Sequence, residues 1–510
     1  MSYDAIVIGA GHNGLTTAGV LAKRGKKVLI VEERQLNGGL ASSHEFHQGH
    51  RTNGLLQDTS LLRREAVKKL NLTKHGLVLE SSAPDFFTPS KEGKGLCLYG
   101  DLDQACLEIA TFSKKDAIAY RKFRKYIAKV SKVVAKFLNT APIQFDNTSI
   151  KETWGLFTTS LSMRMLGEDD MLELLRIPPM AVADWLNEWF ESDLLKANLI
   201  IPAIAGTHCG AWSPGTALNL LFSECIRDVA VKGGPQNLIS SLVKANQELG
   251  VEFKNGTAVK KILVENGKTR GVLLNSGEEI LAPVVASSCD PKKTMQSMVS
   301  PFELDQKFDF HIKNFRQRGT TAVVNLALKS AFTFDCRPDF KVEFARIGES
   351  ANQIEKAHDS IKYRMMSEDP ALELYVASHA NPELAPAGGA TVSILVHFAP
   401  YHLEQGWDQK AEQKLLEIVL KKLETYTSCI RTSVTASQVL SPPKLEAEYR
   451  ITGGHIHHGE KAIDQLMVRP TPETARYQTP IAGLYLCGSG NFPGGDLTCA
   501  PGLLAAQVIQ

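Results

Sequence analysis

The sequence lacks a long apolar run, an excess of charge of one sign and any closely spaced pair of cysteines. No apolar stretch reaches the roughly 18 residues that a membrane-spanning helix requires. The net charge over 510 residues is only +2, so no nucleic-acid partner is predicted. The nine cysteines include no Cys-x-x-Cys pair, which argues against a dithiol redox enzyme and suits a reducing compartment. The first residues show no charged-then-apolar leader, so we expect a cytoplasmic protein.

Glycines stand where a dinucleotide-binding turn requires them. A buried strand is predicted at 3–8 and a helix through residue 24, with the motif Gly-x-Gly-x-x-Gly between them. In this context Gly9 allows the tight turn, Gly11 lets the backbone approach a pyrophosphate, and Gly14 lets helix and strand pack closely. The helix N-terminus then offers free N–H groups to the phosphates.

An acidic residue follows the second strand of this unit, which is predicted at 28–31. Glu32 stands about 20 residues after the glycine turn, where a carboxylate binds the ribose hydroxyls. The doublet Gly38-Gly39 then resembles the second pyrophosphate contact of glutathione-reductase-type flavoproteins, which favours FAD over NAD. The predicted cofactor contacts in this part of the chain are Gly9, Ala10, Gly11, Asn13, Gly14, Glu32, Glu33, Gly38, Gly39, Leu40 and Ala41.

The C-terminal residues predict the other half of the cofactor site. A strand at 483–487 leads into a glycine-rich turn and then a helix at 503–510. Such a turn points backbone N–H groups at an electron-rich ligand. Gly488, Gly495 and Asp496 are therefore predicted cofactor contacts. The Asp496 carboxylate could bind ribityl hydroxyls or cap the helix, and we favour capping.

Both ends of the chain resemble the phytoene-desaturase branch of FAD oxidoreductases. Within that branch the chain resembles the subgroup of the desaturase-like β-carotene ketolase and the pyridine nucleotide-disulphide oxidoreductase domain-containing protein 2. The residues that carry this likeness are Gly-His-Ile-His-His-Gly at 454–459, Asp-Gln-Leu-Met at 464–467, Arg-Pro-Thr-Pro at 469–472 and Tyr-Gln-Thr-Pro at 477–480. The closing segment departs from the family pattern Gly-Thr-His-Pro-Gly-Gly, because Asn491 and Phe492 replace Thr and His. The resemblance therefore transfers the cofactor more securely than the substrate.

The resemblance implies an α/β protein with a Rossmann-type, glutathione-reductase-like FAD-binding domain and an α+β substrate domain. Three chain segments are expected to form the FAD-binding domain, 1–80, 225–295 and 450–510. The substrate domain would then take 81–224 and 296–449. In related flavoproteins the backbone at the position of Val259 contacts adenine.

Alternating patterns predict the strands of these segments. Within 225–295, a helix at 237–249 precedes strands at 251–253, 258–265, 269–275 and 279–286, which alternate like antiparallel strands. The substrate domain is predicted to be largely helical in its first part. Its second part has strands at 320–328, 372–378 and 391–398 and a helix at 408–425. The sequence contains no second glycine-rich dinucleotide-binding motif between a strand and a helix. This favours oxygen, a quinone or internal redox recycling as the electron partner.

A basic amphipathic helix is predicted at 113–139. It carries nine lysines and arginines against one acid, Asp116, and apolar residues recur at helical spacing. One interpretation is peripheral docking on an anionic membrane surface, by which a lipophilic substrate could enter. The alternative is a helix whose apolar stripe covers the core and whose basic face meets solvent.

The expected reaction is hydride transfer from a small apolar substrate, polyene or lipid-like, to flavin N5. The resemblance fixes no catalytic residue. His457 and His458 are the candidates for a proton donor or shuttle, and no metal is predicted. One alternative is a low-turnover flavoprotein with a regulatory or interaction role. Another is an amine or amino-acid oxidase, which for amino acids would need an arginine in the cavity to pair with the carboxylate. The oligomeric state is not predicted.

Overall fold

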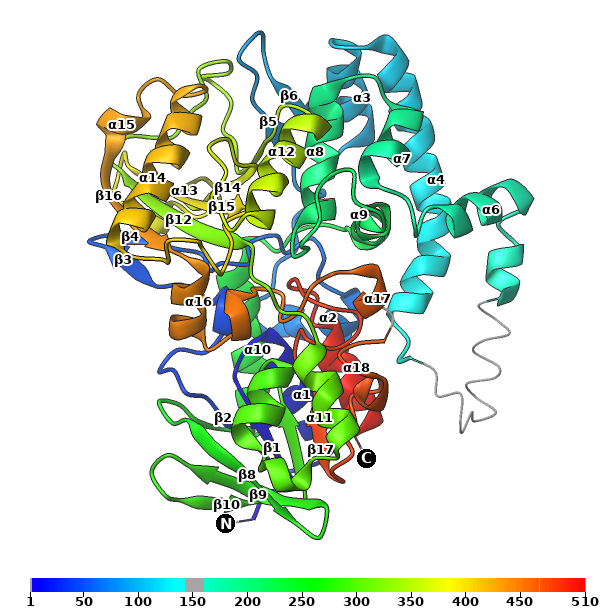
Figure 1. Cartoon of the computed structure of the whole chain (residues 1–510), viewed down its shortest axis with the longest axis vertical. Helices are drawn as coiled ribbons and strands as arrows, with labels where there is room; N and C mark the ends of the chain where they lie inside the picture. The colour runs from blue at the N-terminus through cyan, green and yellow to red at the C-terminus, as the bar shows by residue number, and fades with distance from the viewer. Residues whose placement is uncertain (1, 143–159, 467, 510) are drawn as a thin grey trace.

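A five-stranded parallel sheet occupies one end of the molecule, the lower part of Figure 1. The computed structural model describes residues 2–142, 160–466 and 468–509. The strand order is β17-β11-β1-β2-β7. These strands are β1 (Ala5–Ile8), β2 (Val28–Val31), β7 (Glu252–Lys254), β11 (Val284–Ser287) and β17 (Leu484–Leu486). The sheet is thus assembled from three distant parts of the chain, each within one of the segments predicted for the FAD-binding domain.

Each face of this sheet is covered by a different layer. Ala5 and Val7 of β1 pack with three helices, α1 (His12–Ala22), α10 (Pro235–Glu248) and α18 (Ala500–Val508). Ile6 and Ile8 point to the opposite face, because successive strand residues alternate, and pack against Ile262 and Val272 of a second sheet. This α/β/β layering explains why β1 is apolar at every position.

The second layer is an antiparallel sheet of order β10-β9-β8. Its strands are β8 (Val259–Glu265), β9 (Lys268–Leu274) and β10 (Glu279–Leu281). The strand predicted at 279–286 was wrong as one element, since β10 and β11 are separate strands in two sheets. Pro283 lies between them and offers no N–H to a ladder. The antiparallel expectation for 251–253 was also wrong, because β7 pairs in parallel with β2.

A seven-stranded mixed sheet forms the core of the other end, in the upper left of Figure 1. Its order is β16-β12-β15-β14-β13-β5-β6. The strands are β5 (Phe86–Thr88), β6 (Leu96–Leu98), β12 (Thr321–Leu328), β13 (Phe344–Ile347), β14 (Leu372–Val376), β15 (Ala390–His397) and β16 (Val434–Leu440). One face packs on α14 (Gln409–Glu424) through residues such as Leu374, Ile394 and Val419. The other face looks toward the helices and borders the cavity described below.

Helices cover that second face, in the upper right of Figure 1. The central ones are α4 (Lys114–Leu138), α7 (Val182–Trp189), α8 (Asp193–Ile204) and α9 (Thr216–Ile226). The apolar stripe of α4 is buried, and the Phe123 ring lies 5.4–5.6 Å from those of Trp185, Trp189 and Phe190. Lysines such as Lys122 and Lys125 stay exposed on the outer face. The predicted basic helix therefore covers the core. No helix of the described ranges is long and apolar enough to cross a bilayer.

Shorter elements complete the fold. A small hairpin consists of β3 (Glu45–His47) and β4 (His50–Arg51). The remaining helices are α2 (Arg64–Lys69), α3 (Leu102–Ala110), α6 (Glu168–Arg176), α11 (Gln306–Asn314), α12 (Ala351–Lys362), α13 (Ala377–Ala380), α15 (Ile430–Ser433), α16 (Pro442–Tyr449) and α17 (Ile463–Leu466). Phe308 and Ile312 of α11 pack with Met295 in the core under β8–β10. The contacts of the end that holds the five-stranded sheet thus continue past residue 295.

Candidate active site

Two adjoining cavities lie where the two ends of the molecule meet. The first, which we call the glycine cavity, covers about 1010 Å³ of space without protein atoms, solvent at its opening included, and is lined by Gly9, Gly11 and Glu32. The second, which we call the inner cavity, holds about 1270 Å³ by the same measure and lies between the seven-stranded sheet, α9 and residues 493–498. Leu56 lines both cavities. The two cavities therefore meet at this residue.

The three glycines of the first turn have three different surroundings. Gly9 has φ +93°, which L side chains rarely adopt. A Cβ on Gly14 would come within 2.1 Å of the Gly9 carbonyl oxygen, so only glycine lets α1 pack this closely. A Cβ on Gly11 would meet no protein atom within 4 Å. Gly11 lines the glycine cavity, so the space in front of its backbone is open to a ligand.

The Gly38-Gly39 doublet lies directly against this turn. The Gly38 N–H donates to the Ala10 carbonyl at 2.8 Å. A Cβ on Gly39 would meet the Gly11 Cα at 3.3 Å. Two glycine turns that are far apart in the sequence therefore line the same wall of the cavity.

Glu32 stands at the carboxyl end of β2 and is buried. Its Oε2 accepts the Ala10 N–H at 2.6 Å and its Oε1 accepts the Arg34 N–H at 2.9 Å. Each oxygen keeps lone pairs for further donors. A carboxylate fixed in this way beside the cavity is suited to accept hydrogen bonds from ribose hydroxyls.

The structure brings most of the predicted cofactor residues together. Those that line the glycine cavity are Gly9, Gly11, Asn13, Glu32, Glu33, Gly39, Leu40 and Val259. Gly495 and Asp496 line the inner cavity. The others stand behind the walls, and these are Ala10, Gly14, Gly38, Ala41 and Gly488. A Cβ on Gly488 would come within 2.3 Å of the Ser288 carbonyl oxygen, so this glycine serves packing.

The two ends of the chain are joined beside the glycine turn. The Asn13 Nδ2 donates to Ser489 Oγ at 3.0 Å, and the Asn13 Oδ1 accepts the Gly502 N–H at 3.3 Å. Thr17 Oγ1 also donates to the Gly502 carbonyl at 3.0 Å. These bonds hold the C-terminal loop over the N-terminal turn.

Capping by Asp496 was the wrong prediction. The residue before α18 is Cys499, which makes no side-chain cap. The Asp496 carboxylate instead pairs with Lys461 Nζ at 2.6 Å and lies 3.2 Å from His457 Nδ1. Burial opposes ionisation, but Lys461 and His457 hold the pKa of Asp496 well below its ordinary value. This charged group forms one wall of the inner cavity.

The two candidate histidines face different compartments. His457 lines the inner cavity, and His458 lines the glycine cavity. Burial lowers the pKa of both rings, that of His458 to about 4, so both imidazoles are neutral at neutral pH. His12 also lines the glycine cavity, and burial lowers its pKa to about 4. Of these three histidines, only His457 lines the inner cavity, and it has a carboxylate neighbour, Asp496.

Arg469 fixes the loop that carries these histidines. Its fully buried guanidinium donates to the carbonyls of His457, Gly459 and Glu460 at 2.8–3.2 Å. It also donates to Ser489 and Gly490, at 3.3 and 3.1 Å. One side chain thus ties the histidine loop to the C-terminal glycine turn. Arg469 belongs to the Arg-Pro-Thr-Pro motif that was noted in the sequence. The sequence did not predict that its side chain joins two loops.

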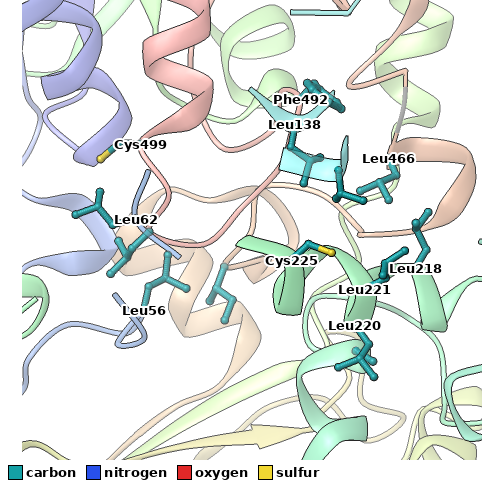
Figure 2. Packing of buried hydrophobic residues seen from close by; sticks show 14 of the residues in the cluster. Leu56, Leu62, Leu138, Leu218, Leu220, Leu221, Cys225, Leu466, Phe492 and Cys499 are labelled. Carbon is teal, nitrogen blue, oxygen red and sulfur yellow. The ribbon is translucent and has the colours of Figure 1, made fainter. Parts of the chain in front are cut away.

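Apolar side chains from distant segments line much of the inner cavity. Figure 2 shows three of them, Leu56, Leu138 at the end of α4 and Leu466 of α17. Further apolar lining residues are Leu61, Phe86, Pro202, Ala205, Phe222, Ile226, Leu395, Ile456 and Leu497. The cavity can therefore bury a sizeable hydrocarbon body.

Charged side chains also line the inner cavity, which the sequence did not predict. Arg227 pairs with Asp58 at 2.8 Å, and Arg346 lies 3.5 Å from Glu373. Burial alone would raise the pKa of Glu373, but His397 and Arg346 bring it down to about 2. The alternation of β14 was a usable signal. It places Glu373 and Tyr375 on the face opposite the apolar positions that pack on α14.

Arg63 is different from these paired charges. It lines the inner cavity with only 5% of its surface exposed. Its backbone N–H donates to the Thr498 carbonyl at 3.0 Å. Its side chain has no hydrogen bond or ion pair with any other described residue, and Nε is buried without a partner. Burial lowers the pKa of the guanidinium to about 10, which leaves it charged at neutral pH.

The donor set fits FAD. The open backbone at Gly11, the uncapped N-terminus of α1 and the Glu32 carboxylate suit a pyrophosphate and a ribose. His12 Nε2 and His458 Nδ1 are buried beside this cavity without hydrogen-bond partners. The adjoining inner cavity, lined on one side by the C-terminal loop, has space for a ring system and a substrate. A mononucleotide would fill only the glycine cavity and leave the inner cavity empty.

Comparison with known families agrees with this geometry. Residues 120–504 match the family described as flavin containing amine oxidoreductase. Residues 7–56 match the NAD(P)-binding Rossmann-like domain, which includes both glycine turns and Glu32. The Rossmann-type α/β fold and the FAD cofactor that the sequence predicted are confirmed.

Similar proteins cover the whole chain. The pyridine nucleotide-disulfide oxidoreductase domain-containing protein 2 of Rattus norvegicus is 30% identical, over 99% of this chain and 93% of that protein. One of the subunits of limonene dehydrogenase from Castellaniella defragrans is 26% identical, over 99% and 94%. The all-trans-zeta-carotene desaturase of Myxococcus xanthus is 24% identical, over 96% and 90%. These matches confirm the predicted resemblance.

A solved structure shows the same fold. Putrescine oxidase bound to putrescine superposes with a TM-score of 0.60 at 15% identity, over 100% of this chain and 98% of that one. At this identity the likeness concerns the fold alone. The full-length match to the rat protein and the family match over most of the chain decide membership. The chain belongs to the flavin containing amine oxidoreductase family and is an FAD-dependent oxidoreductase.

Proposed function

We propose that this protein dehydrogenates an apolar, polyene or lipid-like substrate bound in the inner cavity. The observation that carries this proposal is the apolar lining contributed by Leu56, Leu138 and Leu466, which meets the C-terminal loop at Leu497. A limonene dehydrogenase and a zeta-carotene desaturase are among its relatives, and both names refer to hydrocarbon substrates. FAD supplies the hydride acceptor, its N5 atom.

The cofactor contacts follow from the two compartments. Gly11, Gly39 and the N-terminus of α1 would hold the pyrophosphate, and Glu32 the ribose. Val259 would lie at the adenine, and Gly495 at the flavin side of the inner cavity. Arg469 holds the histidine loop and the C-terminal turn in fixed positions beside the predicted cofactor site.

Removing hydrogen from two neighbouring carbons releases a proton as well as a hydride. His457 is the residue placed to accept that proton, because its ring is neutral and lines the inner cavity. Asp496 lies 3.2 Å from its Nδ1 and would stabilise the imidazolium that forms. The other cavity carboxylates, Asp58 and Glu373, are already engaged with Arg227, Arg346 and His397.

Anaerobic mixing tests this function. The FAD-loaded protein is combined with terpenes, carotenoids and a lipid extract, and the yellow absorbance is followed. We expect bleaching by one of these classes, and replacing His457 with Asn should slow it about 10²- to 10⁴-fold while FAD stays bound. Bleaching by simple amines alone would favour an amine oxidase. A yellow protein that no extract reduces would favour a regulatory role.

Peripheral membrane contact is a separate proposal that concerns α4. Since most of its apolar stripe is buried, contact would use mainly the exposed lysines, among them Lys114, Lys122, Lys125 and Lys132. Sedimentation with vesicles containing phosphatidylserine should then fall when these four become Gln, and fall with salt. Equal sedimentation of the variant and the parent protein would refute this contact.

A further inference from the structure

Arg63 is a buried cation at the wall of the substrate cavity, with no ion-pair partner in the described part of the chain. Every other cation that lines the inner cavity has an acidic neighbour, Arg227 with Asp58, Arg346 with Glu373 and Lys461 with Asp496. The Arg63 guanidinium has no hydrogen bond or ion pair with a described residue, and the acid whose charge acts on it, Glu65, is exposed. The lining therefore carries one buried cation that no acid of the described residues contacts directly.

Such a charge is costly unless a ligand compensates it. Removing an ion from water without a partner is strongly unfavourable. Only 5% of the Arg63 surface is exposed, and its guanidinium stays protonated at neutral pH. An anion that enters the inner cavity would recover this cost and form paired N–H···O bonds with the planar guanidinium.

The pyrophosphate of FAD would bind in the glycine cavity and is therefore not the anion that pairs with Arg63. The open glycine turns and the N-terminus of α1 border the glycine cavity. Arg63 borders the inner cavity only. The anion that reaches Arg63 must therefore come with a ligand of the inner cavity.

We propose that the substrate is a long-chain carboxylate whose head group pairs with Arg63. This inference rests on the proposed function, since it takes the inner cavity as the substrate cavity. The apolar walls at Leu56, Leu138 and Phe222 bind the chain, and Arg63 binds the carboxylate. A pure hydrocarbon would leave the guanidinium buried and unpaired, and a protonated amine would be repelled by it.

Equilibrium binding tests this assignment without turnover. The FAD-loaded protein is titrated with decanoate and with decan-1-ol, which have the same chain, and the change in the flavin spectrum gives the affinity. The parent protein should bind decanoate at least tenfold more tightly. Replacing Arg63 with Met should weaken decanoate binding roughly tenfold to hundredfold and leave decan-1-ol unchanged.

Arg64 supplies a matched control. It is the next residue in the chain, about half exposed, and it pairs with Asp228 outside the cavity. Arg64→Met should leave decanoate binding unchanged. Arg63→Lys, which keeps the charge but not the planar fork, should retain an intermediate affinity and covers the case in which Arg63→Met does not fold.

Three results would overturn the proposal. One is equal binding of decanoate and decan-1-ol by the parent protein, which requires no variant. Another is leucine binding as tightly as decanoate, which would indicate a short amino-acid substrate. The third is an unchanged decanoate affinity in Arg63→Met together with an altered flavin reduction potential, which would assign Arg63 to the cofactor. Arg63-dependent decanoate binding without flavin bleaching by any lipid would refute only the proposed function.

Discussion

Gly11 and Gly14 lie three positions apart, but a side chain would meet backbone atoms at Gly14 and none at Gly11. At Gly14 a methyl group would collide with the Gly9 carbonyl oxygen at 2.1 Å, whereas at Gly11 it would enter open space. Gly11 also has φ −71°, which any residue can adopt. The same substitution should therefore test folding at one position and ligand binding at the other.

Gly14→Ala should lower the free energy of unfolding by roughly 1–3 kcal/mol or more, because backbone must move. Gly11→Ala should change it by less than about 1 kcal/mol in FAD-free protein, but weaken FAD binding at least about tenfold, since the methyl group occupies the approach to the backbone. Chemical denaturation and FAD titration measure the two quantities. FAD binding by Gly11→Ala at the parent affinity would contradict the assigned glycine role.

Asp496 shows what local sequence cannot decide. A capping rule uses the neighbours along the chain, and Asp496 stands shortly before a helix. Its actual partners, Lys461 and His457, belong to a loop that only the tertiary fold brings to it. Arg63 was missed for the same reason, since nothing next to it in the sequence indicates a cavity.

At the scale of elements, two loops depend on one arginine. Arg469 donates to five backbone carbonyls, three in the histidine loop and two in the C-terminal turn. Arg469→Met should lower the free energy of unfolding by about 3–5 kcal/mol, because buried carbonyls lose their donors. It should also reduce the FAD content after purification.

Arg469→Lys gives the sharper comparison. A lysine keeps the charge, but its single ammonium cannot reach both loops as the guanidinium does. We therefore expect little recovery of FAD content, measured from the ratio of visible to ultraviolet absorbance. Full recovery by lysine would show that charge alone matters and that the proposed link between the loops is wrong.

Periodicity predicts well those helices and strands whose pattern of apolar residues follows one repeat from end to end. The strand at 28–31 was predicted with its observed bounds, and α14 to within one residue at each end. The region 279–286 failed because it is apolar on both sides of Pro283 and serves two sheets. For the helix at 113–139, the sequence showed an apolar stripe without showing what covers it, and the structure places Trp185 and Phe190 there.

At the scale of the whole molecule, two buried histidines make stability depend on pH. Burial lowers the pKa of His12 and His458 to about 4, whereas an unfolded histidine titrates near 6.5. Between these values the unfolded chain binds more protons, so stability is complete above about pH 6.5 and is lost as pH falls toward 4. Each histidine contributes up to about 3 kcal/mol to this loss.

Denaturation of FAD-free protein at a series of pH values measures this effect. The double variant His12→Asn, His458→Asn should decline less steeply between pH 6.5 and 4, and asparagine tolerates the positive φ of residue 458. Other buried histidines, such as His455, keep the rest of the decline, because burial lowers their pKa as well. His402→Asn, at an exposed position, is the matched control and should leave the curve unchanged. If the free energy of unfolding of the double variant falls with pH as steeply as that of the parent protein, other groups cause the decline.

The cofactor that both ends of the chain enclose is the central claim, and its stoichiometry tests it most directly. Protein purified from cells, or reconstituted with FAD, is denatured, and the released cofactor is identified and counted. We predict FAD at one molecule per chain for the parent protein and a large loss for Gly11→Ala, with Gly11→Ala folded. A colourless parent protein that takes up no FAD would contradict the account.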